Sequence, residues 1–219
     1  MRRLCVLHRQ PLAESDWLIT VFCRDLGRLM LVSSHRRKTI EPTLHCAYEA
    51  DWRQMDDWPT LYAVSESCAW SLQGDHLLCG LYINELLMRF LSNADPAPAL
   101  YDRYEATLVA LSRGDHPEPW LRMLEYQLLE HAGYGFDWHL ASDGLPLQVG
   151  KRYQFLAGIG LVPSVSGDFL AEWLLPLAGS GQPDSVSWVC AKRILRMAID
   201  HALDHPLSSR QLFSWRNEV

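Results

Sequence analysis

No apolar run in the sequence has the length of a membrane span. The run from Phe169 to Gly179 is interrupted by Glu172, whereas a spanning helix needs about 20 apolar residues. At the amino-terminal end only Leu4–Leu7 is continuously apolar, which is shorter than the apolar core of a secretory signal. We therefore expect no contact with a membrane and a cytoplasmic location.

Sequence motifs of metal sites and of activated nucleophiles are also missing. The six cysteines include no C-x-x-C pair, so their spacing argues against a four-cysteine zinc site and indicates reduced, buried thiols. Neither Ser-x-x-Lys nor Gly-x-Ser-x-Gly occurs in the chain, and these are common settings of a reactive serine. We expect no catalytic residues, no metal and no other cofactor, and therefore no enzymatic activity.

The charge is unevenly distributed along the 219 residues. The net charge of −6 by itself argues against binding to nucleic acid. Residues 1–47, however, hold eight Lys/Arg and four Asp/Glu, a balance of +4, whereas residues 48–79 hold one and six, a balance of −5. Because a local basic patch attracts phosphate whatever the average charge, residues 1–47 are a candidate nucleic-acid contact.

Short runs of β-branched, aromatic and other apolar residues dominate about the first seventy residues and predict strands. The residues Arg24–Gly27 are the expected turn between the second and third runs, where Gly27 can supply a positive φ. Five short strands suit a small barrel such as the five-stranded OB-fold. The expected strands are Arg3–Leu7, Trp17–Cys23, Arg28–Ser33, Leu44–Arg53 and Leu61–Ser65.

From Asp75 the apolar residues recur at helical spacing. They predict helices over about 75–92, 98–113, 118–132 and 185–204. Residues 138–183 are rich in Gly and Pro and are expected to be irregular. The predicted fold class is therefore α+β, with an N-terminal five-stranded OB-fold barrel in residues 1–75 followed by a mainly α-helical domain in residues 76–219.

The run His35–Lys38 directly follows the third expected strand. An isolated run of this length is usually a solvated loop. Here further arginines lie on neighbouring strands of the same barrel, and Trp17, Phe22 and Trp52 could stack on bases. A basic groove combined with aromatic side chains binds single-stranded nucleic acid. The candidate DNA-binding residues are Arg2, Arg3, Arg9, Arg24, Arg28, His35, Arg36, Arg37 and Lys38.

Three helical motifs resemble those of a known protein family. Residues Tyr82–Leu87 read Tyr-Ile-Asn-Glu-Leu-Leu, residues Leu121–Glu125 read Leu-Arg-x-x-Glu, and residues Ala132–Gly135 read Ala-Gly-Tyr-Gly. In this order and spacing they resemble the RecO family of bacterial recombination mediators. Further similar stretches lie between residues 7 and 32 and between residues 191 and 213, so the similarity runs nearly from end to end.

The resemblance implies a role in recombinational DNA repair after DNA damage. Such proteins bind single-stranded and also double-stranded DNA through the OB domain, here residues 1–75, and anneal complementary strands. They help to replace the single-strand-binding protein SSB with RecA, so the implied partners are DNA, the C-terminal tail of SSB, RecR and, indirectly, the RecA filament. The resemblance implies no ATP and a nucleoid-associated location within the cytoplasm.

The SSB tail is acidic and ends in phenylalanine, so it needs an apolar pocket and cations. Arg122 opens an otherwise apolar helix. An arginine in this position is usually a surface residue with a buried stem, and the family comparison turns it into a candidate for the tail. The expected tail-binding residues are Leu121, Arg122, Leu124, Leu128, Lys192 and Arg196.

Two departures from the family pattern leave an alternative open. The loop Ser33–Lys38 keeps the positive charge but lacks the glycine of the family, and Arg53–Asp57 is acidic where relatives are basic. The chain could then be a non-enzymatic adaptor that binds SSB and RecR and has weak or lost DNA affinity. Some relatives carry zinc-binding cysteines in the region matching 138–175; this chain has none there, so the insertion at about 138–183 is expected to hold no zinc.

Overall fold

The computed structural model describes the chain except for residues 14–15, 35–40, 56–57 and 215–219. The chain divides into two compact units. The first is Met1–Pro117 together with the chain from Leu207 onward, and the second is Glu118–Pro206. The predicted boundary between residues 75 and 76 falls inside the first unit, where strands give way to helices.

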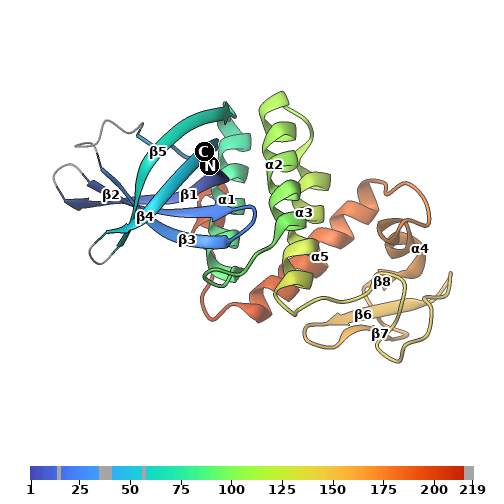
Figure 1. Ribbon diagram of the computed structural model, residues 1–219. Helices are drawn as coiled ribbons and strands as arrows, with labels where there is room; N and C mark the ends of the chain where they lie inside the picture. The colour runs from blue at the N-terminus through green and yellow to red at the C-terminus, as the bar shows by residue number, and fades with distance from the viewer. Residues whose placement is uncertain (14–15, 35–40, 56–57, 215–219) are drawn as a thin grey trace. The chain divides into compact units, whose positions relative to one another are not determined.

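The first unit begins with a closed barrel of five strands (Figure 1). The strands follow the order β1-β2-β3-β5-β4, and β4 pairs with β1 to close the sheet. The pair β3–β5 is parallel, whereas the other pairs are antiparallel. The predicted OB-fold barrel followed by helices is confirmed. The strands are β1 (Arg2–Ala13), β2 (Asp16–Cys23), β3 (Gly27–Ser34), β4 (Cys46–Met55) and β5 (Trp58–Ala69).

The hairpin between β2 and β3 turns where the sequence predicts it. Gly27 has a φ of 74°, a left-handed conformation that favours glycine. A Cβ atom on Gly27 would lie 2.0 Å from the carbonyl oxygen of Asp95, so this close approach also requires glycine. The amide of Ala94 donates to the carbonyl of Arg28 at 2.9 Å and fixes the hairpin against the segment around Asp95.

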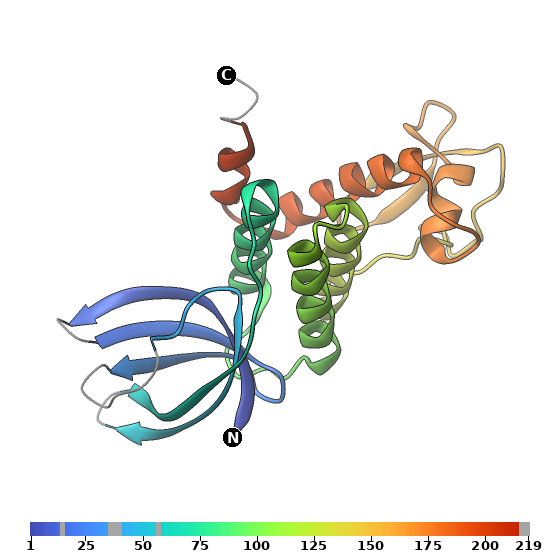
Figure 2. The same cartoon turned by 90° about the horizontal axis from the view of Figure 1, so that it is seen from above.

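Three helices complete the first unit: α1 (Gly74–Phe90), α2 (Pro98–Arg113) and α6 (Ser209–Ser214). In Figure 2 the helix α1 stands beside the barrel with α2 next to it. The side chain of Asn84 on α1 is buried and makes two hydrogen bonds to other elements. Its Nδ2 donates to the Leu7 carbonyl at 3.1 Å, and its Oδ1 accepts from the Tyr104 hydroxyl at 2.7 Å. These hydrogen bonds link β1, α1 and α2.

The second unit contains α3 (Pro117–His131), apart from its first residue, and α5 (Ser185–Ala202). Between these helices the sequence predicts irregular chain, but the structure has a small antiparallel sheet in the order β7-β6-β8. Tyr153 and Phe155 alternate with exposed residues along β6 and are buried, and this period of two marks a strand. The remaining elements are β6 (Arg152–Leu156), β7 (Gly160–Pro163), β8 (Phe169–Leu170), α4 (Ala171–Leu174) and the 3-10 helix η2 (Leu175–Ala178).

Within the described ranges, no helix combines the length and the apolar character needed to cross a membrane.

Candidate functional site

The described arginines of the predicted DNA-binding set do not form one cluster. Arg3, Arg24 and Arg28 come together, since the amide of Arg24 donates to the Arg3 carbonyl at 3.2 Å and Arg28 pairs with Phe22 just before the same turn. Arg9 pairs across to Ile19, farther along β1 and β2. His35, Arg36, Arg37 and Lys38 lie outside the described residues.

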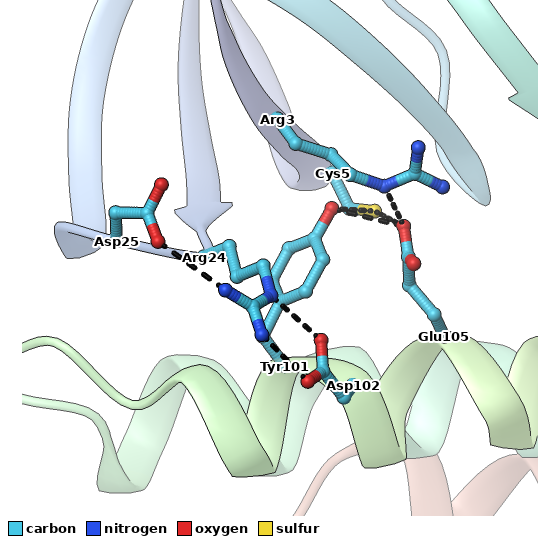
Figure 3. A network of polar contacts seen from close by, with 7 residues as sticks. All are labelled: Arg3, Cys5, Arg24, Asp25, Tyr101, Asp102 and Glu105. Carbon is cyan, nitrogen blue, oxygen red and sulfur yellow. Dashed lines mark hydrogen bonds and ion pairs between the residues drawn. The ribbon is translucent and has the colours of Figure 1, made fainter.

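Two of these arginines are held by carboxylates of α2 (Figure 3). Arg24 donates from Nε to Oδ1 and from Nη2 to Oδ2 of Asp102, at 2.8 Å in each case. Arg3 donates from Nε to Glu105 Oε1 at 2.8 Å. The hydrogen bonds from Arg24 lower the pKa of Asp102. Both guanidinium groups therefore already have anionic partners within the first unit.

The Glu105 carboxylate also belongs to a group of polar contacts with Tyr101 and Cys5 in the first unit (Figure 3). The hydroxyl of Tyr101 donates to Glu105 Oε1 at 3.1 Å and lies 3.2 Å from the Cys5 sulfur. Burial raises the pKa of the Cys5 thiol and of the Tyr101 hydroxyl, so both stay protonated and neutral near pH 7. The cluster is therefore a polar connection between β1 and α2.

Arg28 is held by a different group. Its Nη1 donates to the main-chain carbonyl of Met88, in the last turn of α1. The end of a helix carries partial negative charge and unpaired carbonyl groups, which a cation satisfies. Arg3, Arg24 and Arg28 thus attach the barrel to α1 and α2, a role that the sequence did not indicate because their partners are distant along the chain.

Arg2 and Arg9 are placed differently, because each lies over an aromatic ring. The guanidinium of Arg9 is 4.8 Å from the ring centre of Trp17, and that of Arg2 is 5.1 Å from the ring centre of Trp52. Arg9 also pairs with Glu41 at 2.8 Å. A cation over an aromatic face is favourable. In proteins that bind single strands, cations contact the phosphates and aromatic rings stack on the bases.

A further pair of an arginine and an aromatic ring was not predicted from the sequence. Arg53 lies 5.7 Å from the ring centre of Tyr62 on the β4–β5 hairpin, and Tyr62 is half exposed. Because Arg53 begins an acidic stretch, the charge pattern gave no sign of it. Nearby carboxylates include Glu49 and Asp51 on β4, so this hairpin combines one arginine–aromatic pair with negative charge.

The second unit contains a pocket of about 90 Å³ between α3 and α5. This volume exceeds the roughly 15 Å³ that one water molecule needs. The lining is mostly apolar and aromatic, with one cation, Arg122; its principal members are Arg122, Met123, Tyr126, Trp138, Trp188 and Leu195. The lining, apolar with few polar groups, is of the kind found in ligand sites, but the pocket is smaller than the roughly 300–1,000 Å³ of sites for drug-sized molecules.

Arg122 is a buried cation with two acidic neighbours on its own helix. Its side chain is 8% exposed, and its Nη2 donates to Glu125 Oε1 at 2.7 Å. Its Nη1 lies 3.2 Å from Glu118 Oε1. The Nε of Arg122 is buried and has no hydrogen-bond partner among the described residues. A buried donor without an acceptor is unfavourable, so the side chain retains one unused N–H group.

The other predicted tail-binding residues divide into two groups. Leu121, Leu124 and Leu128 are buried, whereas the pocket is lined by other positions of α3. Lys192 and Arg196 on α5 are exposed and pair with Glu118 at 3.5 Å and Asp200 at 3.9 Å. The apolar periodicity identified the core face of α3, and the pocket occupies the adjacent face.

From α5, which lies in the predicted helix over about 185–204, Trp188, Ala191 and Leu195 line the pocket. Trp138 and Leu177 complete the lining from segments that the sequence showed as irregular. Within the described part of the chain, no three His, Cys, Asp or Glu side chains are grouped as a metal would need.

The chain is similar to known proteins over nearly its whole length. A family model described as "Recombination protein O C terminal" matches residues 72–142. A DNA repair protein RecO of Pseudomonas aeruginosa is 36% identical over 97% of this chain and 94% of its own length. The DNA repair protein RecO of Photobacterium profundum is 34% identical over 97% and 95%, and that of Haemophilus influenzae is 32% identical over 98% and 95%.

Proposed function

Because the chain belongs to the RecO family, we propose that it is a recombination mediator in DNA repair that anneals complementary single strands and helps to replace SSB with RecA. Its work is done by binding energy, without a catalytic residue or a cofactor. The observation that carries this proposal is the pocket with Arg122 in an apolar lining, because annealing on coated DNA requires contact with the coat protein.

The pocket suits a peptide that ends in phenylalanine. A phenyl ring fits an aromatic lining such as that of Tyr126, Trp138 and Trp188. A terminal carboxylate can accept from the guanidinium of Arg122, which has an unused buried N–H. The exposed cations Lys192 and Arg196 on α5 can interact with further acidic residues of the tail. The tail-binding site is therefore proposed on α3 and α5.

The test is binding of a peptide with the sequence character of the SSB tail, acidic and Phe-terminated, by calorimetry. Arg122→Ala should weaken binding by about 1.5–3 kcal/mol, the range for hydrogen bonds to charged groups. Since this change leaves Glu125 buried without its cation, the fold must be checked by circular dichroism.

A second variant avoids the buried ion pair. Met123 lines the pocket and is 41% exposed, so Met123→Glu adds a negative charge at the rim and should also weaken the acidic peptide. Val165→Glu is the matched control, because Val165 is 99% exposed in the same unit and lies outside the lining. Unchanged binding in both pocket variants, each well folded, would remove the pocket from the proposal.

The DNA site is proposed on the barrel within residues 1–75. Arg2 over Trp52, and Arg9 over Trp17 although paired with Glu41, supply cations and stacking surfaces, and His35–Lys38 add four basic side chains in sequence. Two phosphate backbones repel each other, so a basic surface that holds one strand lowers the barrier for a second strand to approach. RecR and, indirectly, the RecA filament are further proposed partners.

A second candidate is the adaptor without useful DNA affinity. It is favoured by the carboxylates of Asp102 and Glu105, which hold two of the candidate DNA-binding arginines, and by Glu49 and Asp51 on β4. A salt titration of single-strand binding by the whole chain separates the two. Binding that disappears at physiological salt, with retention of the tail peptide, would favour the adaptor.

A further inference from the structure

Two carboxylates contact Arg122, and they differ in kind. Glu125 is 1% exposed and accepts a hydrogen bond of 2.7 Å. Glu118 is 21% exposed and lies 3.2 Å from the guanidinium, but its Oε1 takes part in no hydrogen bond among the described residues. Glu125 is therefore the hydrogen-bonded partner of Arg122, whereas Glu118 is a less well aligned ion-pair partner whose Oε1 is also buried.

Glu118 also has a second cation within reach. Its Oε2 lies 3.5 Å from Nζ of Lys192, whose side chain is 57% exposed on α5. If Glu118 left Arg122, it would keep a cationic neighbour. The displaced Glu118 carboxylate would therefore not be left as an unpaired charge, and an unpaired charge would make this movement unfavourable.

We propose that Glu118 is an internal competitor for Arg122, and that the carboxylate of an incoming peptide takes its place while Glu118 moves towards Lys192. This inference rests on the proposed tail site. In the unliganded protein Glu118 is the second carboxylate beside Arg122, after Glu125, and in the complex a ligand carboxylate with better alignment takes its place. A ligand without a carboxylate does not make this exchange, so Glu118 lowers the affinity for acidic peptides and leaves that for neutral ligands unchanged.

Three variants separate competition from a general change of charge. Glu118→Gln removes the negative charge and keeps the shape. Glu118→Asp keeps the charge but is one methylene shorter, so it loses the contact with Arg122. Asp204→Asn removes the same charge from an exposed residue beyond the end of α5 and is the matched control.

The measurement is the dissociation constant of the acidic, Phe-terminated peptide for the whole chain, by calorimetry, with thermal unfolding as a check on the fold. Glu118→Gln should bind about threefold to tenfold more tightly, the scale of a partly buried ion pair. Glu118→Asp should also bind more tightly, although by less. Asp204→Asn should change the dissociation constant less than about twofold, because exposed charges are screened at this range.

Each other result has a definite meaning. Binding by Glu118→Gln that is no tighter than that of the unmodified chain overturns the competition, while the tail site survives if Arg122→Ala still weakens the peptide. Equal gains in Glu118→Gln and Asp204→Asn, or no gain in Glu118→Asp, mean that only the overall field matters and also overturn it. Absence of peptide binding in both the unmodified chain and Glu118→Gln overturns the tail site, and the competition with it.

Discussion

Arg24 and Asp102 are joined by two parallel hydrogen bonds of 2.8 Å, although they lie 78 residues apart. One comes from the turn between β2 and β3, and the other lies on α2 (Figure 3). An arginine in a two-point contact with a carboxylate is well fixed. Its positive charge is largely offset before any DNA arrives, so basic residues of the barrel should differ in their contribution to DNA binding.

The first prediction concerns this difference. Replacing Arg36, Arg37 and Lys38 together by Ala should flatten the log–log salt dependence of single-strand binding by roughly 2, because each phosphate contact contributes about 0.7. Arg24→Ala should leave the slope nearly unchanged, because Asp102 holds this side chain. The measurement is fluorescence anisotropy of a labelled strand over a series of salt concentrations. An unchanged slope in the triple variant excludes this loop from the site.

The second prediction concerns Asn84, which connects β1, α1 and α2. Asn84→Ala removes partners from the buried Leu7 carbonyl and the Tyr104 hydroxyl. The free energy of unfolding should fall by on the order of 1–3 kcal/mol, the penalty for buried polar groups left unpaired. Tyr104→Phe keeps the hydrogen bond to Leu7 and should cost less. Urea unfolding measures both, and an equal loss in the two variants would contradict the central position of Asn84.

The third prediction concerns pH and the docking of α6. Glu85 on α1 accepts from the amides of Ser208 and Ser209 at 2.9 and 2.8 Å. Burial alone would raise the pKa of Glu85, but the hydrogen bonds from Ser209 and Ser208 outweigh it and hold the pKa below its ordinary value of 4.5. A carboxyl with a lowered pKa stabilises the fold above the unfolded-state value, and this contribution is lost as the pH falls through the folded-state value.

The free energy of unfolding should therefore decrease as the pH is lowered from about 4.5, as linkage requires. Glu85→Gln should be less stable near pH 6 and should lose less on acidification, since it has no carboxyl to protonate. Urea unfolding of both proteins at several pH values between about 6 and 3 provides the comparison. Curves that stay parallel over the whole range would mean that Glu85 makes no such contribution.

The barrel could be predicted because its signals are local. Alternating and β-branched residues mark each strand, and Gly27 marks the β2–β3 turn. The same reasoning identified the four long helices. It failed for β6–β8, because these strands are short and lie among glycines and prolines. Two alternating buried residues, Tyr153 and Phe155, are too few to predict a strand from the sequence.

The sites were harder to predict because they depend on distant partners. Arg24 looks like any exposed cation until Asp102 is known to face it. On α3, the periodic Leu121, Leu124 and Leu128 are buried, and the pocket is lined instead by Arg122, Met123 and Tyr126. Arg122 is the one predicted tail-binding residue that lines this pocket, and only the family motif made it a candidate; its role in binding stays a prediction.

The central claim is that one chain carries two separate sites, one for DNA on the barrel and one for the SSB tail beside Arg122. It is tested most directly by the rate of annealing of complementary strands, naked and SSB-coated, with no nucleotide or metal added. The unmodified chain should accelerate both reactions. Arg122→Ala, or Met123→Glu if the first does not fold, should anneal naked strands at the unmodified rate and fail on coated strands. Equal loss on naked and coated strands, or an absolute requirement for ATP or Zn²⁺, would contradict this division of labour.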